Sequence, residues 1–139
     1  MRTLWASLFT AWLAISPAGA EIADADRDAI EETVRGQMAA FLRDDAGAAY
    51  GYASRTVQGL FPSPGLFIEM VRRAYQPVYR PAEARFRPPE ETPGGIVQPV
   101  IVRAPDGRFW LARYAMQRQP DGSFRIDGCT LEALPDTGA

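Results

Sequence analysis

The chain has 139 residues, of which 47% are hydrophobic and 23% charged, and its formal net charge is −2. This length and composition are typical of one soluble globular domain with a modest core. The absence of histidine excludes histidine-dependent triads and histidine-ligated zinc sites, and the single cysteine, Cys129, excludes an internal disulfide. The weakly acidic balance offers no basic field for nucleic acid or anionic lipid.

The first twenty residues have the pattern of an export signal. Arg2 precedes an apolar run over residues 4–15, and Ala18-Gly19-Ala20 offers the small side chains that a signal peptidase reads. We therefore expect cleavage between Ala20 and Glu21 and a periplasmic or secreted mature protein. The run is shorter than the roughly 20 residues that span a bilayer, and no cysteine follows it directly. We expect no stable membrane anchor after cleavage.

The mature part, residues 21–139, is predicted to be one domain with an ordered core over about residues 22–134. Its first half has helical patterns. Apolar residues recur at helical spacing from Asp26 to Leu42, with Asp24 or Asp26 as the expected cap. Asp44-Asp45 is expected to end this helix and to cap a second, short one over Ala46–Ala53.

Ser63-Pro64 predicts the start of a further helix, because serine caps a helix and proline suits its first position. Pro77 is expected to end that helix. Its apolar face is predicted to contain Leu66, Phe67, Met70, Val71 and Ala74.

After Pro77 the spacing of the apolar residues changes from that of a helix to every second residue, as in a strand. Short strands are predicted at Val78–Tyr79 and Ala82–Arg87, followed by an irregular loop over Pro88–Gly95. Asp106-Gly107 and Asp121-Gly122 are typical of hairpin turns. They predict an antiparallel meander of three strands, over Ile96–Arg103, Arg108–Gln117 and Ser123–Leu131. Helices followed by a meander indicate an α+β fold, with helices packed on a curved sheet.

Two-residue turns would fix which side chains share a face of this sheet, and a bulge would change the assignment. One face is expected to hold Trp110, Ala112, Tyr114, Met116, Val97, Ile101, Asp127, Cys129 and Leu131. The other face is expected to hold Val100, Val102, Phe109, Leu111, Arg113, Phe124 and Ile126. Both faces are largely apolar, so we expect helices on one and a second subunit of a homodimer on the other.

Several segments resemble a bacterial family of exported proteins, domain of unknown function 4864. They are Gln37–Phe41, Asp44-Asp45, Ala49–Ser54, Leu60-Phe61, Phe67–Val71, Tyr75, Val78–Ala82 and Asp121–Gly128. Phe124 departs from the tryptophan expected there. The resemblance covers nearly the whole mature chain and implies a cone similar to the nuclear transport factor 2-like superfamily. That superfamily hosts isomerases, dehydratases, ligand binders and dimerisation modules, so the resemblance assigns no catalytic residue.

Few side chains are candidates for a metal-binding, catalytic or ligand-binding site. Asp44-Asp45 fits a cap between helices and Glu90-Glu91 fits a solvated loop, and neither has the ligand count of a calcium site. We predict no metal and no cofactor. Aromatic residues are expected in the core or, in the functional interpretation, around a ligand cavity. The candidate ligand-binding residues are Tyr50, Tyr75, Trp110, Tyr114 and Asp127.

Asp127 lies within an apolar strand. Burial would raise its pKa and make it a candidate acid or base together with Tyr114. The alternative is an edge or bulge aspartate that faces water or pairs with Arg125 or Arg113. Cys129 is interpreted as a small buried apolar group.

The function that we expect is a non-catalytic exported module that binds a small apolar molecule or an envelope protein. One alternative is a cofactor-free isomerase, dehydratase or hydrolase that uses Asp127 with a tyrosine. Another is a structural or assembly module that works through its sheet face. The position of Asp127 relative to the tyrosine hydroxyls is expected to distinguish them.

Overall fold

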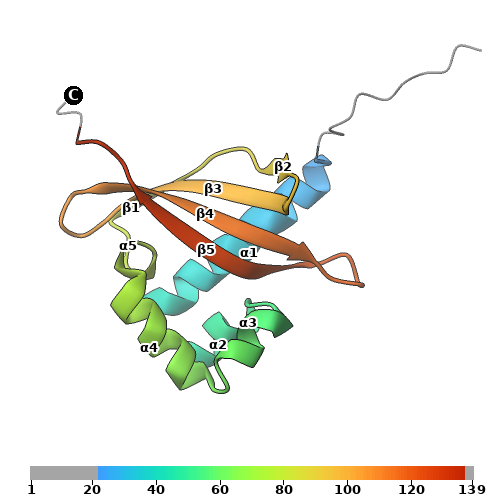
Figure 1. The fold of residues 1–139 in the computed structure, drawn as a ribbon, viewed down its shortest axis with the longest axis horizontal. Coiled ribbons are helices and arrows are strands. Elements are labelled where there is room, and N and C mark those ends of the chain that lie inside the picture. The colour runs from blue at the N-terminus through green and yellow to red at the C-terminus, as the bar shows by residue number, and fades with distance from the viewer. Residues whose placement is uncertain (1–21, 137–139) are drawn as a thin grey trace, which may run out of the picture.

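A computed structural model describes residues 22–136 of the chain (Figure 1). The predicted export signal, with its cleavage site between Ala20 and Glu21, lies outside these residues. The helices are α1 (Asp24–Leu42), α2 (Ala46–Gly51), α3 (Arg55–Leu60), α4 (Pro64–Ala74) and α5 (Gln76–Tyr79). The strands are β1 (Glu83–Phe86), β2 (Glu90–Thr92), β3 (Gly95–Arg103), β4 (Phe109–Arg118) and β5 (Phe124–Ala133). None of the helices in this part of the chain has the length and apolar content needed to cross a membrane.

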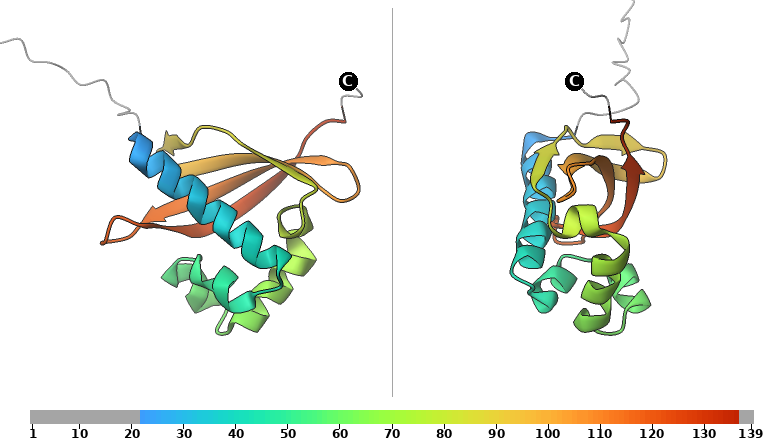
Figure 2. Two further views of the ribbon diagram at one scale, coloured as in Figure 1. Left: turned by 180° about the vertical axis from the view of Figure 1, so that it is seen from behind. Right: turned by 90° about the vertical axis from the view of Figure 1, so that its left-hand side faces the viewer.

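The strands form one antiparallel sheet in the order β1-β3-β4-β5, and β2 pairs with the other end of β3. The sheet curves around α1, which lies along its concave side, while α2, α3 and α4 gather below one end (Figure 2). The α+β prediction, with N-terminal helices packed on a curved antiparallel sheet, is confirmed.

The predicted pairing between β3 and β4 is wrong by one residue. Arg103 pairs with Phe109, and the amide of Ala104 donates to the carbonyl of Arg108, so three residues form the loop. The left-handed φ of +88° at Gly107 permits this loop. Because side chains alternate along a strand, the shift reverses every β3 side chain. The even-numbered residues of β3, Ile96 to Val102, therefore share the concave face with Tyr114, whereas Val97 and Ile101 face outward.

The second hairpin combines a similar loop with a β-bulge. Tyr114 pairs with Cys129 as predicted, but Met116 pairs with Ile126. Asp127 is thus the additional residue of a bulge between Ala115 and Met116. Phe124 and Ile126 consequently point to the concave face, contrary to the prediction.

The helix boundaries needed further corrections. α1 begins after Ala23, which has no side chain to cap it, and the carboxylate of Asp26 accepts from Arg118 at 2.6 Å instead. The predicted second helix ends at Gly51, and the additional helix α3 follows it. Pro77 does not end a helix but lies in the first turn of α5, which occupies the predicted strand Val78–Tyr79.

Two further segments differ from the prediction. The predicted irregular loop contains the short edge strand β2, whose three residues are all exposed. Leu66 and Ala74 were predicted on the apolar face of α4 but are exposed, whereas Ile68, which the prediction left out, is buried. Ile68 packs in the apolar cluster among the helices together with Phe67 and Val71.

Two apolar clusters form the core. The first joins α1 to the concave face of the sheet and contains Ile30, Val34, Val100 and Tyr114 among others. The second lies among the helices, where the ring of Phe41 is 6.3 Å from that of Phe67 and 5.5 Å from that of Tyr79. Tyr75 packs against both clusters.

Asp44 and Asp45 have separate structural roles at the end of α1. Asp45 caps α2 by accepting from the amide of Ala48. Asp44 adopts a left-handed φ of +54° and accepts hydrogen bonds from the Tyr79 hydroxyl and from Arg72 and Arg80. These donors, with Tyr79 as the largest cause, lower the pKa of Asp44. The side chain of Asp44 therefore joins α1 to α4 and α5.

Candidate functional site

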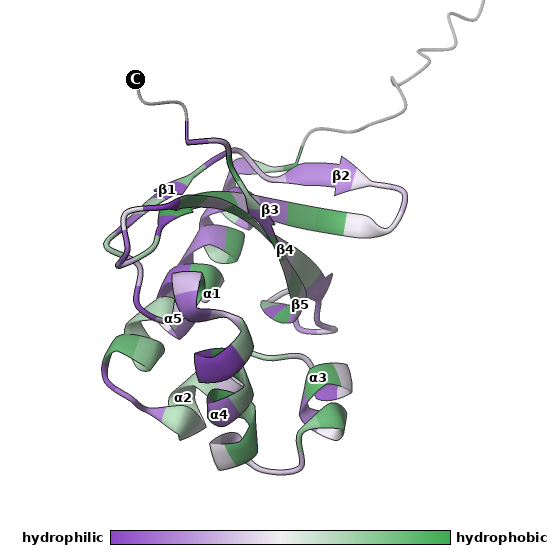
Figure 3. Cartoon of the chain, turned by 60° about the vertical axis from the view of Figure 1, so that its left-hand side comes forward, coloured by the Kyte–Doolittle hydropathy of each residue, from purple (hydrophilic) through white to green (hydrophobic). Residues whose placement is uncertain are grey.

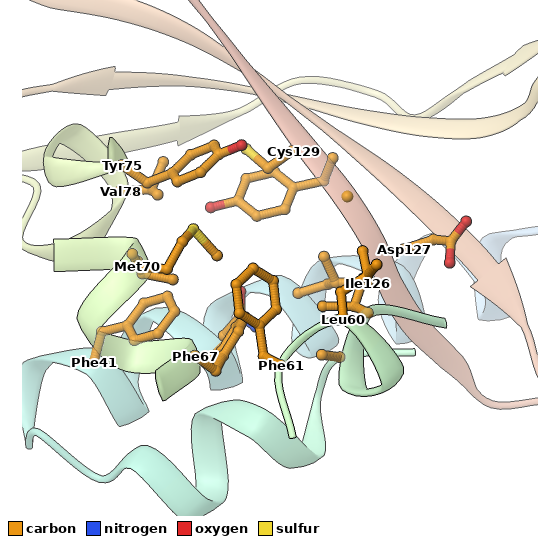
Figure 4. A pocket seen from close by; sticks show the side chains of 16 residues that line it. Phe41, Leu60, Phe61, Phe67, Met70, Tyr75, Val78, Ile126, Asp127 and Cys129 are labelled. Carbon is orange, nitrogen blue, oxygen red and sulfur yellow. The ribbon is translucent and has the colours of Figure 1, made fainter. Parts of the chain in front are cut away.

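A pocket of about 280 Å³ lies between the helices and the sheet and is lined by residues of both apolar clusters (Figure 4). Its volume lies just below the range of about 300–1,000 Å³ that is typical of ligand-binding pockets. The lining residues are Gln37, Phe41, Ala53, Val57, Leu60, Phe61, Phe67, Met70, Val71, Tyr75, Val78, Tyr114, Ile126, Asp127, Gly128 and Cys129.

Most of this lining is apolar. Figure 4 shows Phe41, Phe67 and Phe61 along the helical side, with Met70 reaching from α4 into the space between them and the sheet. Leu60 is 71% exposed and marks the outer side of the pocket, on α3. Figure 3 shows hydrophobic segments in α3 and α4, in contrast to the hydrophilic β2. A site of this composition favours an apolar molecule.

Tyr114 is the most unusual polar residue of the pocket. Its side chain is 1% exposed, and within residues 22–136 its hydroxyl has no hydrogen-bond partner. Burial raises the pKa of Tyr114 well above 10, and the nearby Cys129 raises it further. The hydroxyl therefore remains protonated and can donate a hydrogen bond across the physiological pH range.

Asp127 lies at the rim of the pocket and is exposed, which agrees with the alternative of a bulge aspartate that faces water and not with a buried acid or base. Its carboxylate accepts a hydrogen bond of 2.6 Å from the Ser54 hydroxyl. Figure 4 shows the carboxylate directed away from the aromatic side chains. No hydrogen bond joins Asp127 to Tyr114 in the described part of the chain. The β-bulge explains this separation, because the additional residue does not follow the alternation of its neighbours.

Of the other aromatic residues predicted to bind a ligand, one lines the pocket and two do not. Tyr75 lines the pocket beside Val78. Tyr50 does not line it, and its hydroxyl donates to the carbonyls of Gln58 and Phe61, which holds α3 and the following loop. Trp110 also lies outside the lining, where Arg108 stacks over its ring at 5.4 Å.

Sequence reasoning missed α3 and therefore Val57 and Leu60. The signal for α3 was Ser54, which caps it by accepting from the amide of Val57 at 3.2 Å. The bulk of the helical wall was part of the predicted apolar face of α4, namely Phe67, Met70 and Val71. Gln37 was also missed; it is 4% exposed, and its amide donates to the carbonyl of Ala49.

Cys129 lies across the strand pair from Tyr114 and also lines the pocket. Burial raises the pKa of its thiol to about 12. Because only the thiolate is nucleophilic, we expect the thiol to be alkylated at pH 8 at least about 100-fold more slowly than in the urea-unfolded chain. Iodoacetamide labelling followed by intact-mass spectrometry would measure both rates. The alkylation rate of the folded protein should still rise with pH between 8 and 10. Equal rates in the folded and the urea-unfolded protein would contradict the raised pKa of Cys129.

The chemistry open to this site is limited. Among residues 22–136, no group of three or more potential metal-ligating side chains gathers. Asp127 is the one charged residue of the lining, and Ser54 already engages its carboxylate. The arrangement can hold an apolar molecule and offer it one buried hydroxyl donor.

Comparison with known proteins gave one match. A family model described as "Domain of unknown function (DUF4864)" matches residues 23–139. No curated protein and no solved structure matches the chain.

Proposed function

We propose, from the premise that this chain belongs to the DUF4864 family, that it is a non-catalytic exported module that binds one small apolar molecule. The description of the family assigns no activity, so the proposal depends on the site alone. The observation that carries it is the pocket of about 280 Å³ with an almost entirely apolar lining. An engineered cavity of about 150 Å³ lined by apolar side chains is enough to bind benzene.

Charge argues for a neutral ligand. No arginine lines the pocket, and the one carboxylate, that of Asp127, lies at its rim and is bonded to Ser54. An ionic ligand would lose its hydration on entry without gaining a partner of opposite charge. The pocket therefore suits an uncharged molecule of about one or two rings.

The two alternative functions have less support. An acid–base mechanism needs Asp127 near a tyrosine hydroxyl, but its carboxylate bonds to Ser54 and is directed away from the pocket. An assembly surface on the outer sheet face would need a broad apolar patch. That face carries the exposed ion pair Arg113–Glu132 and one large exposed apolar side chain, Phe109. We therefore place the function in the pocket.

The test uses 2-ethylnaphthalene, a neutral hydrocarbon, as the probe. Protein is titrated into dilute probe and binding is followed by ligand-detected NMR. We expect saturable one-to-one binding with a dissociation constant below about 3 mM, because roughly 0.3 kcal/mol or more for each heavy atom of this probe amounts to about 3.6 kcal/mol. Absence of saturable binding would contradict the proposal.

Matched variants locate the binding site. Cys129→Phe adds an aromatic ring on the pocket face of β5, and Thr130→Phe adds the same ring on the exposed, opposite face one residue later. We expect the first variant to lose binding at least tenfold and the second to bind within twofold of the unaltered protein. Thermal melts of both variants would verify that they are folded. Equal binding by the two variants would show that the probe binds elsewhere.

A further inference from the structure

The Tyr114 hydroxyl is one of two buried side-chain polar atoms in residues 22–136 that have no hydrogen-bond partner, the other being Nε of the half-buried Arg27. The other buried polar side chains of this part of the chain, those of Gln37, Ser54, Gln98 and Tyr79, each make at least one hydrogen bond. The Tyr114 hydroxyl is buried as well and makes none there. A buried donor without an acceptor costs free energy of folding. Phenylalanine would fill the same space without this cost.

The hydroxyl belongs to a residue that lines the apolar pocket. Its cross-strand neighbours on the concave face are Gln98 and Cys129. The Gln98 amide already donates to the carbonyls of Arg87 and Pro99, and the Cys129 sulfur is a weak acceptor. Within residues 22–136 no hydrogen bond reaches this donor, and a molecule in the pocket can supply the acceptor.

The charge of the lining selects the type of acceptor. A carboxylate or phosphate would need a cationic partner, but no arginine lines the pocket. A neutral oxygen accepts one hydrogen bond from a phenol and needs no counter-charge. A carbonyl oxygen on an apolar body fits a single buried donor surrounded by hydrocarbon.

Met70 is a flexible side chain of the pocket lining. It is half-buried, lines the pocket and extends into its middle (Figure 4). Methionine is unbranched and re-packs readily around different shapes. Movement of this one side chain can open space toward the sheet without displacing the backbone of α4.

We propose that Tyr114 is the polar anchor of the pocket and that the ligand is a neutral apolar molecule with a carbonyl oxygen, which accepts the Tyr114 hydrogen bond. This assignment rests on the proposed function, because it presumes that the pocket binds a ligand. It deepens that function by naming the chemical class of the ligand and the residue that distinguishes it from a plain hydrocarbon.

The experiment compares two probes, 2-acetylnaphthalene and 2-ethylnaphthalene, which differ by a carbonyl in place of a methylene. Each is titrated with the unaltered protein and with the variants Tyr114→Phe and Tyr75→Phe. Tyr75 is the matched control, because it is the other tyrosine of the lining. We expect Tyr114→Phe to weaken binding of the ketone about tenfold and to change binding of the hydrocarbon less than twofold. Tyr75→Phe should leave the ratio of the two affinities unchanged.

Infrared spectroscopy of the bound ketone provides a direct second measurement. The carbonyl stretch of ¹³C-labelled 2-acetylnaphthalene should shift to lower frequency in the unaltered protein and in Tyr75→Phe, but not in Tyr114→Phe. This readout reports the hydrogen bond itself, which a purely structural role of Tyr114 would not change.

The outcomes separate the two proposals. Binding of both probes with an affinity ratio that Tyr114→Phe leaves unchanged would overturn the Tyr114 assignment and leave the apolar pocket standing. An unshifted carbonyl stretch in the bound ketone would overturn it as well. If neither probe binds the unaltered protein, the proposed function fails, and the Tyr114 assignment fails with it.

Discussion

Replacing Ile30 with alanine is expected to lower the free energy of unfolding by about 3 kcal/mol, within the roughly 2–5 kcal/mol typical of buried Ile→Ala changes. Ile30 is 0% exposed and lies on α1 in the cluster that joins this helix to the concave face of the sheet. The substitution removes three buried carbons and leaves a void that the sheet above it cannot close by moving. Urea denaturation followed by circular dichroism would measure the change.

Leu42→Ala on the same helix is the control for this prediction. Leu42 is 53% exposed, and leucine and alanine have similar helix propensities. We expect a change below about 0.5 kcal/mol. Comparable losses for the two variants would mean that the packing of α1 on the sheet is not the main source of stability.

The helical half of the fold was predictable where a periodic apolar pattern coincided with a signal for the start of a helix. α1 combines a long apolar stripe with acidic residues in its first turn, and α4 has Ser63 as its cap and Pro64 as its first residue. α3 has a cap as well, Ser54, but none of its residues is buried, so no apolar stripe accompanies the cap. It is held by tertiary hydrogen bonds, such as that from Tyr50 to Gln58, which a sequence pattern does not reveal.

The hairpins were predictable, but their registers were not. Asp-Gly at a turn is compatible with loops of two or three residues, and the difference reverses the faces of a whole strand. At β5 the bulge at Asp127 compensates for the turn, so Tyr114 and Cys129 remained paired as predicted while Ile126 changed face. The position of such a bulge depends on how the side chains of β4 and β5 pack against each other along the whole pair. The sequence of either strand alone does not predict it.

The sequence predicted the apolar character of the candidate site better than it predicted which residues line the pocket. The aromatic composition and the predicted α4 face indicated an apolar cavity, and Tyr75 and Tyr114 do line it. Tyr50 could not be separated from them by sequence, because its role depends on two carbonyls that fold back toward it. The sequence could not predict that the Tyr114 hydroxyl has no hydrogen-bond partner in residues 22–136, because this depends on which acceptors the folded chain brings near it.

Replacing Ser54 with alanine is expected to have the second large effect, a local loss of about 2 kcal/mol at α3. Ser54 is 0% exposed and its hydroxyl makes two contacts, accepting from the amide of Val57 and donating to Asp127 at 2.6 Å. Loss of a serine cap alone costs roughly 1 kcal/mol, and a hydrogen bond to a charged group contributes more than a neutral one. α3 has no fully buried residue, and its other contacts include the packing of the half-buried Val57 and the hydrogen bonds between Tyr50 and Gln58.

The measurement is amide hydrogen exchange together with binding of 2-ethylnaphthalene. Because α3 supplies Val57 and Leu60 to the pocket, we expect faster exchange over residues 55–60 and severalfold weaker binding. Ser63→Ala is the matched control, since Ser63 caps α4 by accepting from Leu66 but bonds to no carboxylate. The buried residues of α4 should confine the effect of that variant to its first turn. Unchanged exchange in α3 would show that Ser54 does not hold it.

Variants at Asp127 test whether its hydrogen bond with Ser54 stabilises α3. Asp127→Asn keeps an oxygen that can accept from Ser54, so we expect slower exchange in α3 than in Asp127→Ala and nearly unchanged binding of the probe. The Ser54→Ala/Asp127→Ala double variant should differ little from Ser54→Ala alone, because the first change already removes the bond between them. This result would make Asp127 a positioning residue for the pocket wall, acting through Ser54. Additive effects of the two changes would instead assign Asp127 a role independent of α3.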